Sequence, residues 1–240
     1  MREAPYDAIA GWYDELTRST PLYRELILPA TMDLAGDVSG LAILDLACGQ
    51  GMVSRELARR GAKVTGVDIS TKLLEIARAH ERDEPLGIDY FEGNAETLDT
   101  FDDDSFDGVT CGMALMNIDD LDACAQAVRR VLKPGGRFVA SVTHPCFQTP
   151  DADWIDTPAG PARQVRGYFD ERDWESDNPD GVRGKVGEHH RTLSTYINTF
   201  AAAGLLCDRI IEPIAAGRRA EEVPGNLEVP SILVVRFRMY

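Results

Sequence analysis

The sequence predicts an α/β protein built on a doubly wound, mostly parallel sheet, and three observations support this fold class. Strand and helix patterns alternate along residues 41–143, as parallel strands joined by helical crossovers require. The composition is 44% hydrophobic and 27% charged, which is ordinary for a globular protein. A chain of 240 residues can bury about three-quarters of its unfolded surface. We therefore expect a self-supporting core.

The predicted strands are short apolar runs, and they occupy residues 42–47, 63–68, 88–91, 106–113 and 137–143. The predicted helices carry apolar residues at helical spacing. The first covers residues 52–60 and stops at Gly61, the second is capped by Ser70, and the third covers 119–132 and ends at Pro134-Gly135-Gly136. A helix at 193–203 and strands at 205–212 and 232–239 complete the pattern.

We expect these elements to form a single domain over residues 1–240, with two parts that interrupt the alternation. The domain has four segments, namely a helical N-terminal cap (1–40), a core (41–144), an insertion (145–190) and a C-terminal helix with the last two strands (191–240). The cap and the insertion are the two that interrupt the alternation. The insertion is rich in Pro, Gly and Asp and is expected to lack regular structure. Long irregular segments of this kind are often lids or binding loops.

The charge balance disfavours two classes of partner. Lys and Arg number 25 against 40 Asp and Glu, which gives a net charge of −15. Such a surface repels nucleic-acid phosphates and anionic lipid heads. The N-terminus has no apolar signal-peptide core, no apolar run approaches a membrane span, and the five cysteines form no CxxC pair. We expect a cytoplasmic protein with reduced cysteines and no metal site.

A glycine-rich turn is the strongest functional signal. Residues 44–51 read LDLACGQG, a strand that runs into a tight turn before a helix, and Asp68 ends the next strand. Small residues let a ligand approach the backbone, and a carboxylate in the position of Asp68 accepts hydrogen bonds from ribose hydroxyls. A dinucleotide fingerprint would place a glycine where Ser54 stands. Asp45 beside the turn also suits an amine-bearing ligand better than a pyrophosphate.

On these motifs the chain resembles the class I S-adenosylmethionine-dependent methyltransferases that act on small molecules. LDLACGQG resembles the first motif of that family, and GVDIS at 66–70 resembles the second. GNAE at 93–96, CGMALMNIDDL at 111–121 and VLKPGGRF at 131–138 resemble three further segments. The resemblance implies a Rossmann-like seven-stranded sheet whose last strand is antiparallel, and S-adenosyl-L-methionine as the cofactor.

The resemblance also implies a set of cofactor-binding residues. Asp68 would hold the ribose, Ile69 would pack on adenine, and Asn94, in place of the family's usual Asp, would accept from the adenine amino group. The N-terminal YDAIAGWYDEL resembles an opening helix that folds over the cofactor in many relatives. The full expected set is Tyr6, Tyr13, Asp45, Ala47, Cys48, Gly49, Gly51, Asp68, Ile69, Asn94, Ala95, Glu96 and Met113.

Methyl transfer needs a base only when the acceptor must lose a proton, and histidines are the candidates. His144 follows the fifth strand at the carboxyl end of the sheet, where ligands of open α/β sheets bind. His189 and His190 close the insertion, and the arrangement HPCF, insertion, HHRTLSTY resembles a subset of the family with a substrate lid. The alternatives are a structural hydrogen bond for His144, and helix capping or solvent exposure for the pair.

The expected acceptor-binding residues are polar or aromatic side chains near the same edge of the sheet. Met116 and Asn117 follow the fourth strand, and the insertion supplies aromatic rings. The alternatives are a turn role for Asn117 and loop anchoring for the rings. The full expected set is Met116, Asn117, Tyr168, Phe169 and Trp174.

Three functions remain open from the sequence. The first is methyl transfer to O, N or C of a small-molecule acceptor by a monomer or homodimer. The second is an NAD-dependent oxidoreductase, against which Ser54 and Asp45 argue. The third is a regulator that binds the cofactor without catalysis, against which the aromatic insertion argues.

Overall fold

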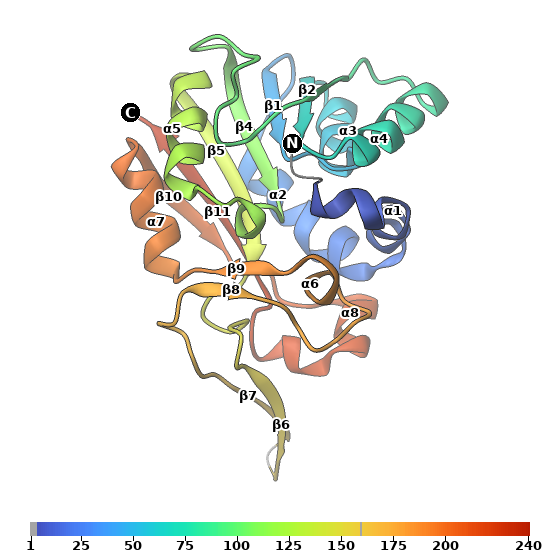
Figure 1. The fold of residues 1–240 in the computed structure, drawn as a ribbon, viewed down its shortest axis with the longest axis vertical. Helices are drawn as coiled ribbons and strands as arrows, with labels where there is room; N and C mark the ends of the chain where they lie inside the picture. The colour runs from blue at the N-terminus through green and yellow to red at the C-terminus, as the bar shows by residue number, and fades with distance from the viewer. Residues whose placement is uncertain (1–3, 159) are drawn as a thin grey trace.

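A seven-stranded sheet forms the centre of the computed structural model, which describes residues 4–158 and 160–240 (Figure 1). The strand order is β10-β11-β5-β4-β1-β2-β3, and β11 is antiparallel to both of its neighbours. The other pairs are parallel. The predicted fold class, with an antiparallel last strand, is confirmed. The strands are β1 (Ala42–Leu46), β2 (Lys63–Asp68), β3 (Asp89–Glu92), β4 (Phe106–Gly112), β5 (Leu132–Thr143), β10 (Leu205–Ile211) and β11 (Ile232–Met239).

Helices cover both faces of the sheet, as a doubly wound fold requires. Their bounds are α3 (Met52–Arg59), α4 (Thr71–Asp83), α5 (Leu121–Val131) and α7 (Leu193–Ala202). One apolar cluster joins α5 and α7 to the sheet around three rings in mutual contact, Phe138, Phe200 and Phe237. A second cluster packs α3 and α4 on the other face. The prediction that Ser70 is the N-cap residue of α4 is confirmed, because its hydroxyl accepts from the Leu73 amide at 3.1 Å.

The segment before β1 is helical and lies beside α4 (Figure 1). Its elements are η1 (Pro5–Ile9), α1 (Ala10–Ser19), the π-helix η2 (Leu22–Ile27) and α2 (Leu28–Ala35). Part of the predicted cap, residues 1–3, lies outside the described residues. Helix α2 packs against β5 and β11, whereas η1 and α1 stand at the carboxyl ends of the strands near α4.

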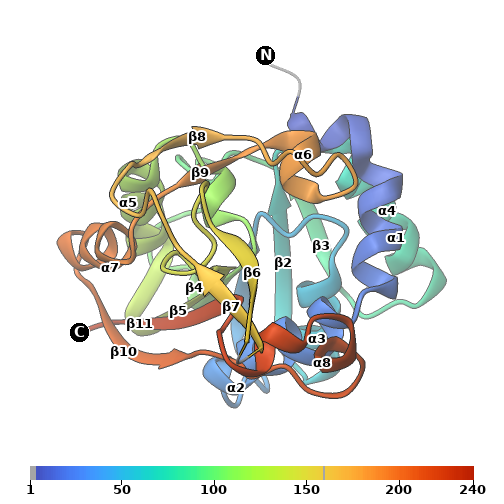
Figure 2. The ribbon, with the colours of Figure 1, turned by 90° about the horizontal axis from the view of Figure 1, so that it is seen from below.

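The expectation of an irregular insertion is wrong. Residues 145–190 contain β6 (Asp153–Thr157), β7 (Gly160–Gln164), β8 (Arg172–Trp174), α6 (Val182–Val186) and β9 (Glu188–His190). Within the described part of the chain, these strands pair only with each other, β6 with β7 and β8 with β9. Strands of three to five residues are too short to produce a readable alternation of apolar and polar side chains. Figure 2 shows β8, β9 and α6 extending from the side of α5 and α7 to the N-terminal helices.

The structure contains three short helices that the sequence patterns did not indicate, and one predicted boundary between a helix and a strand is wrong. Between β10 and β11 lie α8 (Gly217–Glu222) and η4 (Pro224–Leu227), and η3 (Leu115–Asn117) follows β4. The third helix ends at Val131, and β5 begins at Leu132, before the Pro-Gly-Gly triplet. The register jumps from Phe106↔Leu132 to Gly108↔Arg137, so the triplet forms a bulge where a proline is tolerated.

Candidate active site

A cavity of about 760 Å³ opens at the carboxyl ends of β1, β2 and β4. Its floor is formed by the segments that follow these strands and β3, at residues 47–50, 67–70, 93–96 and 112–114. Its other walls come from η1, α1 and η2 on one side and from β8, α6 and β9 on the other. In Figure 1 the arrowheads of β4 and β5 point toward β8 and β9. The cavity therefore lies where open α/β sheets bind ligands.

The glycine-rich turn forms one end of the cavity. Three of its residues have positive φ, namely Ala47 (51°), Gly49 (56°) and Gly51 (86°). A Cβ on Gly51 would stand 2.3 Å from the Tyr90 hydroxyl oxygen, so only glycine fits there. Ala47, Cys48 and Gly49 line the cavity, whereas Gly51 is absent from its lining and shapes the turn through its backbone conformation.

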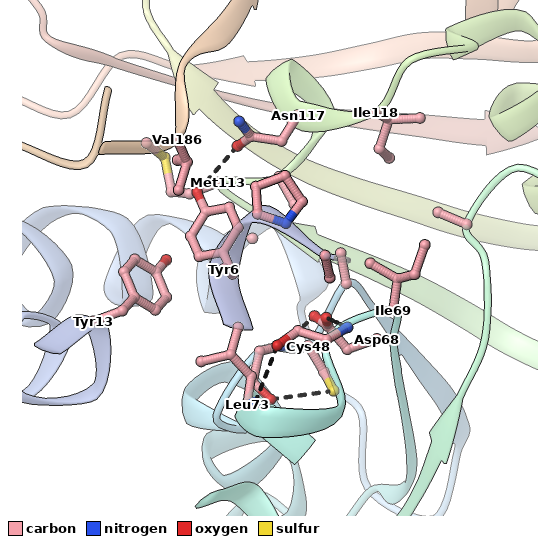
Figure 3. A pocket seen from close by; sticks show the side chains of 18 of the residues that line it. Tyr6, Tyr13, Cys48, Asp68, Ile69, Leu73, Met113, Asn117, Ile118 and Val186 are labelled. Atoms are coloured by element: carbon pink, nitrogen blue, oxygen red, sulfur yellow. Dashed lines mark hydrogen bonds between the residues drawn. The ribbon is translucent and has the colours of Figure 1, made fainter. Parts of the chain in front are cut away.

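Asp68 lines the cavity at the end of β2. Its Oδ2 accepts from the Gly49 amide and its Oδ1 from the Ser70 amide, each at 2.8 Å. Burial raises the pKa of Asp68 to about 6, and these two backbone donors oppose that rise. Each carboxylate oxygen keeps a second lone pair, so Asp68 can still accept a hydroxyl donor from a ligand in the cavity (Figure 3).

Asp45, another acid of the expected cofactor-binding set, faces away from the cavity. It is 1% exposed and is absent from the cavity lining. The Ser54 hydroxyl donates to its Oδ2 at 2.5 Å, and the Thr110 hydroxyl donates to its Oδ1 at 2.8 Å. Burial raises the pKa of Asp45 to about 6 against the effect of these donors. The structure therefore gives Asp45 a framework position that connects β1, α3 and β4.

The second half of the expected cofactor set lies together along the cavity floor. Ile69 is 56% exposed although it is apolar, so its side chain offers a flat apolar surface beside Asp68 (Figure 3). Asn94 Oδ1 already accepts from the Glu96 amide at 2.9 Å and keeps one lone pair for another donor. Ala95, Glu96 and Met113 also line the cavity, and Met113 has a positive φ of 56°.

Tyrosines of the N-terminal cap form an aromatic cluster over the turn. The rings of Tyr6 and Tyr13 meet edge to face at 5.1 Å, and Tyr13 meets Tyr23 at 6.3 Å. All three line the cavity. The Tyr6 hydroxyl donates to Asn117 Oδ1 at 3.2 Å, which connects the cap to the segment after β4 (Figure 3). Burial raises the pKa of Tyr6 above its ordinary value, so its hydroxyl stays protonated.

Only one of the three candidate histidines lines the cavity. His189 does so, with Nε2 3.0 Å from Asp119 Oδ1 and Nδ1 bonded to Asp173. His144 is buried elsewhere, with Nε2 2.7 Å from Glu212 Oε1, and burial lowers its pKa. Since the Cys146 amide donates to Nδ1 of His144, Nε2 carries the proton in that network.

His190 is also buried outside the cavity lining, with Nε2 3.0 Å from the Tyr168 carbonyl oxygen.

The expected acceptor-binding residues likewise divide into those that line the cavity and those that do not. Asn117 and Trp174 line the cavity. Met116 is 4% exposed in the apolar core, whereas Phe169 is 88% exposed to solvent. The Tyr168 hydroxyl accepts from the Leu193 amide, so this ring anchors the insertion to α7.

Sequence reasoning missed several polar residues of the cavity. The most buried acid among them is Glu188, which immediately precedes the two histidines and is 8% exposed. Thr17 and Gln50 also line the cavity and are hydrogen-bonded to each other. The position of Glu188 directly before two candidate histidines could have identified it from the sequence. No local pattern connects Thr17 to the turn. Among residues 4–158 and 160–240, no group of three or more His, Cys, Asp or Glu is arranged to hold a metal ion.

Comparison with known proteins gives consistent results. The model of a methyltransferase-domain family matches residues 44–140. Ubiquinone biosynthesis O-methyltransferase of Alkalilimnicola ehrlichii is 36% identical over 141 residues, covering 58% of this chain and 57% of that protein. Demethylmenaquinone methyltransferase of Lactococcus lactis is 38% identical over 146 residues, covering 58% of each. This chain thus spans less than two thirds of the length of the curated relatives that it matches.

Solved structures resemble the chain over a larger share of its length. An S-adenosylmethionine-dependent methyltransferase from Mesorhizobium loti superimposes with a TM-score of 0.75 and 29% identity. That match covers 92% of this chain and 99% of the other. The similarity therefore extends beyond the sheet, into the N-terminal cap, the insertion or both.

Proposed function

We propose that this chain, which belongs to the class I S-adenosylmethionine-dependent methyltransferases, transfers a methyl group from S-adenosylmethionine to a small-molecule acceptor. One observation carries the proposal. A single cavity of about 760 Å³ joins the glycine-rich turn and Asp68 to a second half enclosed by the cap and the insertion. Ligand sites typically measure 300–1,000 Å³, and this volume lies in the upper half of that range.

The residues at the turn fit the cofactor. Asp68 keeps a lone pair on each oxygen for the ribose hydroxyls, and exposed Ile69 offers an apolar face for adenine. Ala47, Cys48 and Gly49 let a ligand approach their backbone. When bound, S-adenosylmethionine supplies a methyl group already activated by its sulfonium charge. The protein then has to orient the acceptor and exclude water, which is worth on the order of 7–11 kcal/mol.

The cap and the insertion are proposed to enclose the acceptor. Tyr6 and Tyr13 stand between the cofactor turn and the insertion, and Asn117 and Trp174 face the same space. We assign the three histidines positioning roles. Both ring nitrogens of His189 are bonded to carboxylates, so this side chain connects β9 to the Asp119 loop and to β8. His144 and His190 hold the ends of the insertion in place.

We further propose that the chain works in the cytoplasm on a small molecule and not on nucleic acid. The five cysteines are free, as in a reducing compartment. The net charge of −15 opposes binding to a phosphate backbone. In the described part of the chain, no helix is both long and apolar enough to cross a bilayer.

Thermal unfolding with S-adenosylmethionine, S-adenosylhomocysteine or NAD tests the proposal. A ligand at about 100 times its dissociation constant adds about 2.7 kcal/mol of stability. We expect both adenosyl compounds to raise the unfolding midpoint and NAD to leave it unchanged. S-adenosylhomocysteine production with a panel of small-molecule acceptors then measures turnover. A shift with NAD alone would overturn the methyltransferase assignment, and binding without turnover of any acceptor would favour a regulator.

A further inference from the structure

The cavity is lined by acidic side chains without basic ones to balance them. No Lys or Arg is among the residues that line it in the described chain. Its six carboxylates belong to Asp68, Glu96, Asp119, Asp173, Glu175 and Glu188. Clefts lined by one sign of charge concentrate ligands of the opposite sign and repel those of the same sign. The cavity therefore favours a cationic acceptor over an anionic one.

Glu188 differs from the other acids in its combination of burial and few hydrogen bonds. Its side chain is only 5% exposed, whereas those of Asp119 and Asp173 are 73% and 83% exposed and are bonded to His189. Asp68 is buried, but both of its oxygens accept backbone amides. Glu188 is thus the buried acid of the cavity whose carboxylate receives the fewest close hydrogen bonds from the protein.

The partners of Glu188 do not satisfy its charge. Arg183 Nη1 lies 3.5 Å from Oε1, which is long compared with the 2.7–2.9 Å of a charge-assisted hydrogen bond. The Trp174 indole N–H lies near the carboxylate but outside hydrogen-bonding geometry. Burial consequently raises the pKa of Glu188 despite the opposing effects of Arg183 and Trp174. A cationic donor from a ligand would supply the missing interaction.

Aromatic residues lie near this carboxylate. Trp174 is its cross-strand partner in the β8–β9 pair, and the Arg183 guanidinium already lies over the Trp174 ring, 5.1 Å from its centroid. Tyr6 lies close enough that the charge of Glu188 contributes to the rise in the tyrosine pKa, after burial and Tyr23. Tyr13 and Tyr23 extend the same cluster along the cavity wall. Ring faces attract ammonium groups, and this attraction increases when the site excludes water.

We propose that Glu188, with the ring of Tyr6, recognises a protonated amine on the methyl acceptor. The proposal rests on the methyltransferase function and names the substrate class of that site, an amine without a carboxylate or phosphate near the amino group. The ammonium would donate to Glu188, and its charge would face the Tyr6 ring. Neutral phenols and anionic acids lack the group that this arrangement recognises.

The same carboxylate can prepare the amine for reaction when the amine is itself the methylated atom. A protonated nitrogen has no free lone pair, so it must lose a proton before it can be methylated. Transfer of one proton from the ammonium to Glu188 leaves a neutral amine and a neutral carboxylic acid. The raised pKa of Glu188 favours this transfer, because it brings the proton affinity of the carboxylate closer to that of the amine.

Calorimetric titration of the protein saturated with S-adenosylhomocysteine tests the proposal without turnover. The probes are matched sets on phenylethyl and cyclohexylethyl skeletons that end in an amine, an alcohol or a carboxylate. At neutral pH we expect the amine of at least one set to bind at least tenfold more tightly than its alcohol, and the carboxylates not to bind. Equal binding within both sets, or carboxylate preference, would overturn the proposal.

The variant Glu188→Gln keeps the shape of the side chain and removes its charge. We expect it to lose at least tenfold in amine affinity while its affinity for S-adenosylhomocysteine stays within twofold of the parent. The matched control is Glu228→Gln, an exposed glutamate outside the cavity lining, which should change neither affinity. Unchanged amine affinity in Glu188→Gln would refute the assignment.

A stability measurement separates recognition from a structural role. If Glu188 mainly anchored Arg183, Glu188→Gln would lower the unfolding midpoint. Since its carboxylate is buried with little compensation, we expect the midpoint at pH 8 to stay the same or rise. Binding of S-adenosylhomocysteine with no binding of any amine would reject this inference and leave the methyltransferase proposal intact. Absence of S-adenosylhomocysteine binding by the parent protein would instead reject both.

Discussion

Ser54→Ala should destabilise the protein more at pH 8 than at pH 5. The Ser54 hydroxyl donates to Asp45 at 2.5 Å in a fully buried setting, and Thr110 supplies the second donor. The pKa of Asp45 is about 6, so its carboxylate is ionised at pH 8 and mostly protonated at pH 5. Hydrogen bonds to charged groups contribute about 1.5–3 kcal/mol and neutral ones about 0.5–1.5 kcal/mol. We expect the loss to be about 1 kcal/mol larger at pH 8.

The direction of this pH dependence follows from the linkage between proton binding and folding. Because folding raises the pKa of Asp45 from 3.8 to about 6, the folded state binds more protons between these values, and stability falls as pH rises through this window. Ionising the buried carboxyl therefore costs about 3 kcal/mol, a cost that Ser54 and Thr110 keep from being larger. Removal of the Ser54 donor raises the folded pKa further, and the extra cost appears only above it. Asp68 titrates in the same window but is present in both proteins, so its contribution cancels.

Urea unfolding at both pH values, followed by tryptophan fluorescence, measures the difference. The matched control is Ser105→Ala, which removes a hydroxyl that donates to the Asp102 carbonyl oxygen at 2.7 Å near the surface. Its effect should be within about 0.5 kcal/mol and independent of pH. Equal losses for Ser54→Ala at pH 5 and pH 8 would show that the hydroxyl does not stabilise an ionised Asp45.

Three further outcomes follow from the same geometry. Asp68→Asn should weaken S-adenosylhomocysteine binding at least tenfold by calorimetry, because its carboxylate is the proposed ribose acceptor; unchanged affinity would contradict that role. Gly51→Ala should cost about 2–4 kcal/mol in urea unfolding, from positive φ and the close Tyr90 hydroxyl. Tyr90→Phe in the same chain should recover part of that loss, since it removes the crowding hydroxyl, which has no hydrogen-bond partner among the described residues. His144→Gln should lower stability through loss of the Glu212 contact and leave S-adenosylhomocysteine affinity within twofold, whereas a large loss of affinity would place His144 in the site.

The end of the cavity at the glycine-rich turn, where we propose that the cofactor binds, could be located from the sequence because its signals are local. Asp68 and the turn after β1 end neighbouring strands whose register pairs Leu46 with Val67. Carboxyl ends of adjacent parallel strands meet at one edge of a sheet, so recognising the two strands was enough to bring the residues together. The positive φ of Gly49 and Gly51 is likewise a local property of the residue type.

The acceptor half was not predictable in the same way, because distant pairings build it. Glu188 faces Trp174 only through the β8–β9 pair, and each of these strands is three residues long. Asp45 illustrates a different difficulty. Proximity to the turn suggested a ligand, but its side chain is directed to Ser54 and Thr110. Ser54, which the sequence marked only as a departure from a dinucleotide fingerprint, is the hydrogen-bond donor that this buried acid requires.

Three buried acids of this molecule form a graded series. Burial raises the pKa of each, but the protein satisfies them to different extents. Asp45 accepts from two hydroxyl groups and lies outside the cavity lining. Asp68 accepts from two backbone amides and lines the cavity. Glu188 also lines the cavity but has one long contact with Arg183. Buried polar groups are normally fully hydrogen-bonded, so the capacity left over at Asp68 and Glu188 indicates where ligands complete the structure. In this series, unsatisfied hydrogen-bonding capacity increases from Asp45 beside the sheet, through Asp68 at the glycine-rich turn, to Glu188 on the insertion side of the cavity.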